Sequence, residues 1–149
     1  MRYHDLREAD FLLPHVLVTR RLGDRLQAGV AGGLIVPAVV ALDLPHIREA
    51  GQPQVDPRLA FSRGWLRPPV QHGWAFEIRC EIGPGTATKI GTGITSEIDI
   101  GKLQYTSNSH LELAGYASLD ELKAFWHQNG IDLGRDDPWC WLIEFIFKG

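Results

Sequence analysis

The clearest pattern of hydrophobic and polar positions lies in HGWAFEIRCEI (72–82). Every second residue from Trp74 onward is apolar, namely Trp74, Phe76, Ile78, Cys80 and Ile82. The positions between them include Glu77, Arg79 and Glu81. Successive side chains of a β-strand point to opposite faces, so this period of two predicts a half-buried strand with Trp74 in the core. Arg79 shares its face with two glutamates, so we expect it to be ion-paired.

Two further runs predict strands in the second half of the chain. GPGT (83–86) predicts a turn, and TKIGTGITSEIDI (88–100) follows as a strand. Gly91 and Gly93 share one side of that strand, a feature typical of bulges, barrel corners and places of close approach to the backbone. WCWLIEFIF (139–147) is apolar on both faces apart from Glu144, which indicates a central, covered strand.

The N-terminal third shows weaker patterns. HVLVTR (15–20) predicts a short strand, and RLGDRLQAG (21–29) predicts one or two helical turns that end at Gly29. GVAGG (29–33) lacks the spacing of a phosphate-binding loop and is expected to be an ordinary loop. LIVPAVVAL (34–42) is a buried segment, and its Pro37 excludes a central position in a sheet. Five prolines between 43 and 69 predict loop with short helical pieces.

The segment GYASLDELKAFWHQNG (115–130) carries the strongest helix signal. Ser118 and Glu121 have the spacing of a capping box, in which each satisfies a free N–H group at the helix start. An apolar stripe follows at helical spacing, made of Leu119, Leu122, Phe125 and Trp126. Gly130 is suited to end the helix.

Several strands with a capped helix and irregular connections predict an α+β fold. We expect a small, partly open β-barrel or strongly twisted mixed sheet with flanking helices. The 149 residues have the length of one domain.

The amino-acid composition excludes some classes of function. The formal charge of −3 excludes a strongly basic nucleic-acid binder and leaves room for a local basic patch. Residues 97–149 carry nine acidic and four basic groups, so a polyanion would contact the first two thirds of the chain. Cys80 and Cys140 lie in apolar runs and are expected to be reduced core thiols. The charged first ten residues are unlike a signal peptide, and the apolar run 31–42 is too short to span a bilayer, so we expect a cytoplasmic protein.

The order of these patterns resembles that of a known family. The matching segments are RGWLR (63–67), GWAFEIRCEI (73–82), KIGTGITSEI (89–98), GYASLDELKAFW (115–126) and WLIEFIF (141–147). Together they resemble the ASCH domain family of the PUA-like superfamily. The resemblance covers residues 47–149, and residues 1–46 either complete the barrel or cover its mouth. It implies a small β-barrel with flanking helices and an association with RNA, and some members are enzymes acting on RNA or modified nucleosides.

Members of the amidohydrolase type carry a Lys-Thr pair and a strand glutamate. The corresponding run here is REAGQPQVDPR (48–58), in which Gln52, Pro53 and Gln54 stand where Lys-Thr would be, and the glutamate position falls on Gly91. An amide does not perform the proton transfers of a lysine or carboxylate near neutral pH. The resemblance therefore does not carry that hydrolytic mechanism over to this chain.

Trp65 is the residue best placed to contact RNA. It lies between Arg63 and Arg67 in a proline-bounded turn, where an indole can stack a base while arginines hold phosphate. Equally, the side chain of this tryptophan can pack in the open end of a barrel. The leading hypothesis is a module that binds single-stranded RNA or a modified nucleotide at the barrel mouth. Its site residues would be Arg58, Arg63, Trp65, Arg67, Gly91 and Gly93.

Two alternatives stay open. One is a small metal-independent hydrolase, an amidohydrolase or ribonuclease acting on modified nucleosides or RNA, with Lys89, Glu97 and His72 as candidate catalytic residues. The other is a protein-interaction module that uses the acidic C-terminal third or the loop 43–69. The six histidines lack metal-ligand spacing, so we expect no metal and no cofactor. A buried ionisable pair in a cleft would favour the hydrolase, and an open basic-aromatic groove would favour RNA binding.

Overall fold

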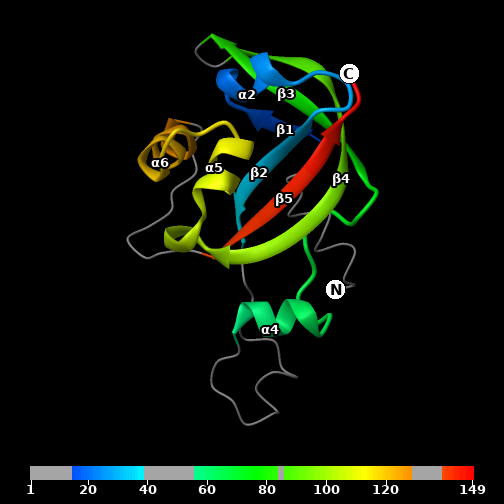
Figure 1. The fold of residues 1–149 in the computed structure, drawn as a ribbon, viewed down its shortest axis with the longest axis vertical. Coiled ribbons are helices and arrows are strands. Elements are labelled where there is room, and N and C mark those ends of the chain that lie inside the picture. Colours follow the sequence, from blue (N-terminus) through cyan, green and yellow to red (C-terminus); the bar gives the residue numbers. More distant parts are fainter. Residues whose placement is uncertain (1–14, 39–55, 84–85, 129–138) are drawn as a thin grey trace.

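The fold is a five-stranded sheet that curls into half a barrel (Figure 1). It is seen in a computed structural model that describes residues 15–38, 56–83, 86–128 and 139–149. The strand order is β1-β3-β4-β5-β2, with β1 parallel to β3 and the other pairs antiparallel. The strands are β1 (His15–Val18), β2 (Ala31–Pro37), β3 (Ala75–Gly83), β4 (Thr86–Lys102) and β5 (Trp139–Phe147). The predicted α+β class with a curled sheet is confirmed.

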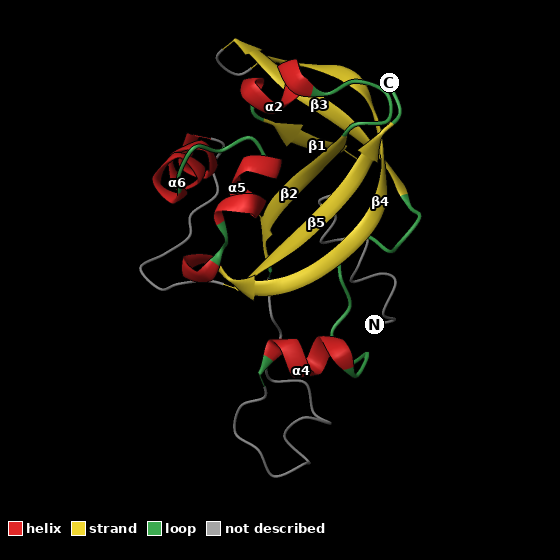
Figure 2. Cartoon of the chain, in the orientation of Figure 1, coloured by secondary structure: helices red, strands yellow, loops and turns green. Residues whose placement is uncertain are grey.

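Short helices surround this sheet (Figure 2). They are α2 (Arg20–Arg25), α4 (Pro57–Ser62), the 3₁₀ turn η1 (Leu103–Tyr105), α5 (Asn108–Leu113) and α6 (Leu119–Gln128). Helix α5 packs beside β2 with α6 next to it, and α4 lies at one end of the half-barrel. None of the helices in the described segments has the length and hydrophobicity of a membrane span.

The inner face of the sheet carries the larger core. Phe145 and Ile78 are fully buried there, and the ring of Phe76 meets that of Phe145 edge to face at 5.4 Å. Helix α4 closes one end of this core because Phe61 packs edge to face on Trp141 at 5.2 Å. Aromatic pairs of this kind stabilise a core beyond the area they bury.

A second core lies on the outer face, where α5 and α6 cover one end of β5. Leu122 and Trp126 of α6 are buried against Cys140, as the apolar stripe of that helix predicts. The capping box is also confirmed, because Ser118 Oγ accepts a hydrogen bond from the Glu121 N–H at 3.2 Å and Glu121 reaches back to the N–H of Ala117. Gly130 lies outside the described residues.

The alternating run 72–82 forms β3, but its ends differ from the prediction. Phe76, Ile78 and Cys80 are buried, whereas Trp74 is 39% exposed and Ile82 is 56% exposed. Trp74 precedes the strand in a turn, where its N–H donates to Gln71 O. The prediction of Trp74 in the core is therefore wrong, because the period of two was extended beyond the strand that carries it.

The glycines at 32 and 33 lie in a strand and not in the predicted loop. A Cβ built at Gly32 would lie 2.5 Å from Cζ of Phe145, so only glycine lets that ring fill the core.

Pro37 ends β2, and this strand lies at the edge of the sheet. This agrees with the prediction that the segment containing Pro37 is not a central strand. Cys80 and Cys140 are both buried in the core, as predicted. Burial is the main reason why the pKa of the Cys80 thiol is raised.

Candidate functional site

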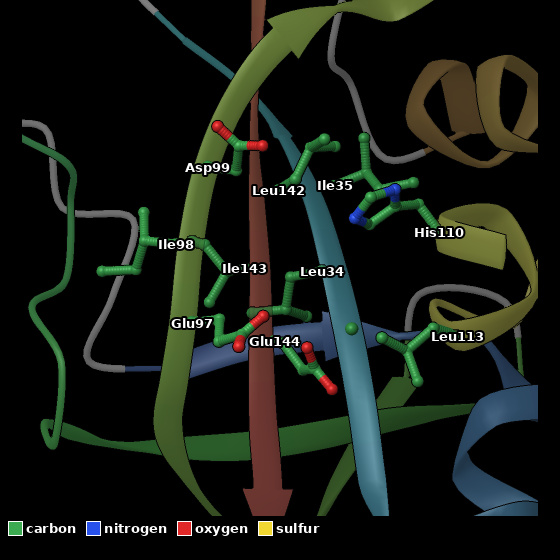
Figure 3. A pocket seen from close by; sticks show the side chains of 11 residues that line it. Leu34, Ile35, Glu97, Ile98, Asp99, His110, Leu113, Leu142, Ile143 and Glu144 are labelled. Atoms are coloured by element: carbon green, nitrogen blue, oxygen red, sulfur yellow. The ribbon is translucent and has the colours of Figure 1, made fainter. Parts of the chain in front are cut away.

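A pocket of about 440 Å³ opens on the outer face of the sheet (Figure 3). Strands β2, β5 and β4 form its floor, and α5 forms one wall with His110 and Leu113. Gly33 and Leu142 make part of the floor, while Glu97, Asp99 and Glu144 supply three carboxyl groups. The size is within the usual range for small-molecule sites.

A β-bulge brings Glu97 into this pocket. The register pairs Thr95 with Phe145 and then Glu97 with Glu144, so Ser96 is an additional residue on β4. Thr95 is only 1% exposed and points to the inner core. Without the bulge, strict alternation would turn Glu97 to that apolar core as well. The additional residue instead places it on the outer face, directly opposite Glu144.

Glu97 and Glu144 form a carboxyl pair in the pocket. They lie side by side in the pocket, and a hydrogen bond joins their carboxyl groups. Burial raises the pKa of Glu144 above its ordinary value, and the charge and hydrogen bond of Glu97 raise it further, while His110 opposes the shift. Two adjacent carboxylates repel each other when both are ionised, which favours the protonated form of Glu144. The raised pKa means that Glu144 keeps its proton to a higher pH than an ordinary glutamate.

The first turn of α5 orients His110 at the edge of the pocket. Ser107 caps this helix, and its Oγ accepts a hydrogen bond from the His110 N–H at 3.1 Å. The same oxygen lies 2.8 Å from Nδ1 of the imidazole, which restricts the ring orientation. Asp99 is held differently, since its Oδ1 accepts from the Ile100 N–H at 2.8 Å. The pocket thus combines acid, base and apolar surface.

A separate basic-aromatic region lies around α4. The guanidinium of Arg63 lies 5.4 Å from the ring centre of Trp65, and that of Arg58 lies 5.8 Å from the ring centre of Trp139. Lys102 Nζ lies 5.7 Å from the same Trp139 ring. Trp65 is half-buried and packs on Ala60. It therefore combines a packing role with an indole that is partly accessible to a base. Arg67 is exposed in the same segment.

Of the three predicted catalytic candidates, only Glu97 lines the pocket. Lys89 is eight residues away on β4, about 26 Å along the strand, and forms an ion pair of 3.8 Å with Glu77. His72 is exposed in the turn before β3. The structure therefore does not bring these three residues together. Arg79 also bonds to Glu77, which confirms its predicted ion pairing.

Gly91 and Gly93 require a correction. Close approach does occur at both, but the approaching atoms belong to the protein itself. A Cβ at Gly91 would lie 2.4 Å from Cζ of Phe147, and one at Gly93 would lie 2.9 Å from Cδ1 of Phe145. Aromatic rings of the core occupy the space that was assigned to a ligand.

Three titratable residues of the pocket were not anticipated as site residues: Asp99, His110 and Glu144. Glu144 had a visible signal, because it is the only charged residue in WCWLIEFIF. Ser107 and His110 have cap spacing in a short helix that hydrophobic periodicity does not reveal. The partnership of Glu144 with Glu97 depends on the register and has no local signal.

Comparisons with known proteins add no assignment. A scan against family models, a search of curated proteins and a search of solved structures each found no match. Within the described segments, no three His, Cys, Asp or Glu side chains are grouped so that they could hold a metal ion.

Proposed function

We propose that the chain is a small hydrolase that works by metal-independent acid–base catalysis in the pocket on the outer face. The observation that carries this proposal is the carboxyl pair, since the register places Glu97 directly opposite Glu144 and both line the pocket. Carboxyl pairs whose environments separate their proton affinities are characteristic of acid–base sites. The RNA-binding hypothesis gives no role to the three carboxyl groups of the pocket.

The pair supplies both proton transfers of a hydrolysis. Ionised Glu97 accepts a proton from a water molecule as its oxygen attacks the carbonyl carbon of an amide. Protonated Glu144 donates its proton to the leaving nitrogen as the carbon–nitrogen bond breaks. The pair ends with the same single proton, now on Glu97, and transfer between the hydrogen-bonded carboxyl groups restores the starting state.

The substrate class follows from the pocket and from the ASCH resemblance. Members of that family that act on modified nucleosides suggest a nucleoside carrying an amide. A base with amine or amide N–H donors suits the carboxyl groups, and Leu113 and Leu142 offer apolar surface for its ring.

The test is hydrolysis of a panel of amide-modified nucleosides, followed by mass spectrometry. Glu144→Gln and Glu97→Gln are expected to lower kcat by about 10²–10⁴-fold, the usual contribution of general acid–base catalysis. Glu112→Gln is the matched control, because Glu112 is an exposed glutamate of α5 outside this pocket. Activity retained in both Glu97→Gln and Glu144→Gln, or its equal loss in Glu112→Gln, would sink the proposal.

RNA binding stays as a second candidate because of the Arg63–Trp65 pair. If a base stacks on Trp65, then Trp65→Ala weakens binding of a labelled single-stranded RNA by about 1–3 kcal/mol in fluorescence anisotropy. The affinity should also fall with salt. Trp74→Ala is the control, since Trp74 is an exposed tryptophan outside the arginine-rich turn. Equal affinities of wild type and Trp65→Ala would exclude this stacking role.

A further inference from the structure

Arg58 lies beside the pocket, at the end away from the carboxyl pair. Its Nη2 is 3.8 Å from the place where a Cβ would stand on Gly101, and Cδ1 of Leu142 is 3.9 Å from that place. Gly101 is two residues beyond Asp99 on β4, so both face the same side of the sheet. Leu142 lines the pocket. The guanidinium therefore borders the floor that leads to Glu97 and Glu144.

Arg58 and Lys102 flank the ring of Trp139 at this end of the sheet. Arg58 and Lys102 both lie within 6 Å of the Trp139 ring, a distance at which cations interact with an indole. Among the described residues, neither forms an ion pair with a carboxylate. Like charges at one ring repel each other, and an anion bound beside them would relieve that repulsion. Arg58 is exposed, so a ligand can reach it.

The two ends of this surface are separated by a length that suits an extended ligand. Gly101 is four residues from Glu97 on β4, which corresponds to about 13 Å. One end then offers acceptors for a base, and the other offers a guanidinium suited to the oxygens of a phosphate. A nucleoside 5′-monophosphate has this arrangement of groups and this shape.

We propose that Arg58 forms an anion subsite of the pocket, and that the ligand is a nucleoside 5′-monophosphate and not a free nucleoside. Trp139 holds the guanidinium in place. Lys102, one residue beyond Gly101 on β4, lies beside Trp139 and faces the other side of the sheet. This inference rests on the pocket that we propose as the hydrolase site, and it assigns that site a phosphorylated substrate.

The experiment compares the binding of cytidine, adenosine, their 5′-monophosphates and inorganic phosphate by isothermal titration calorimetry. Wild type should bind each monophosphate about 10-fold or more tightly than its nucleoside, as a charge-assisted contact implies. Arg58→Gln should reduce that ratio to about 2-fold or less, and Arg58→Lys should give an intermediate value. Arg20→Gln is the matched control, because it removes the same charge from an exposed arginine of α2 outside the pocket.

Equal affinity for nucleoside and monophosphate would overturn the inference, as would an equal effect of Arg20→Gln or the absence of any monophosphate binding. Inorganic phosphate that binds as tightly as the monophosphates would also contradict a two-ended ligand. Glu144→Gln should weaken the binding of nucleoside and monophosphate by the same factor. The ratio of their affinities should therefore stay unchanged. Because the readout is binding, failure of hydrolysis would refute the proposed chemistry without changing this result.

Discussion

One additional residue on β4, Ser96, determines the chemistry of the pocket. It turns Glu97 away from the inner core and places it opposite Glu144, where the two carboxyl groups share a hydrogen bond. A carboxyl group in contact with another carboxyl, partly removed from water, binds its proton more tightly. The same arrangement that supports acid–base chemistry therefore makes the stability of the protein depend on pH.

The sign of this dependence follows from the raised pKa of Glu144. Between its ordinary value of 4.5 and the raised value, the folded state binds more protons than the unfolded state. The contribution of Glu144 to the free energy of unfolding is therefore complete below pH 4.5 and is lost as the pH rises through the folded pKa.

Glu144→Gln should remove this dependence. At pH 7 we expect the variant to be more stable than wild type by about 0.5–1 kcal/mol, a small value because water partly screens the pair. Urea unfolding of both proteins across pH 4–8 measures the difference, with Glu112→Gln as the control. A difference that stays constant over this range would contradict the raised pKa of Glu144.

At the scale of elements, β4 carries glycines at the positions where it packs most tightly against the inner core. Gly91 and Gly93 lie under Phe147 and Phe145, and a register shift between β3 and β4 occurs at Ile78 and Arg79. Bulges and glycines let a sheet bend, which allows the half-barrel to curl around its aromatic core. These glycines thus contribute to curvature and packing.

Gly91→Ala should destabilise the protein, because its Cβ would overlap Phe147 at 2.4 Å and the backbone of Gly149 at 2.7 Å. Overpacking of this kind costs about 1–3 kcal/mol. Gly83→Ala in β3 is the matched control, since among the described residues no atom beyond its chain neighbours lies within 4 Å of its Cβ position. Chemical denaturation of the two variants provides the measurement, and equal stabilities would argue against this packing.

At the scale of the whole molecule, one sheet separates two cores. Ile78 belongs to the inner core and Leu122 to the outer core, and β5 contributes residues to both. Charge is also divided, with arginines around α4 and carboxyl groups in the pocket. Because both cores share the same strands, neither is expected to persist when the other is lost.

Variants in either core should therefore shift a single unfolding transition. We expect Leu122→Ala to cost about 2–5 kcal/mol and Ile78→Val about 0.5–1.5 kcal/mol. Far-UV circular dichroism and tryptophan fluorescence should give coincident curves for both variants. Separate transitions would mean that the outer helices unfold independently of the half-barrel.

The sequence by itself determined the features that depend on neighbours along the chain. Its period of two located β3, its cap and apolar stripe located α6, and the apolar run 139–147 identified the internal strand β5. These signals are local, since they follow from the geometry of one strand or one helix and the side chains that it must bury.

Only the tertiary structure decided what those elements bring together. The pocket joins Gly33, Glu97, His110 and Glu144 from four separate elements. Their meeting depends on strand order, on register and on a one-residue bulge, and a shift of one residue moves a side chain to the other face of a sheet. Periodicity carries no information about such pairings, because the energy that selects them comes from contacts between residues far apart in the chain.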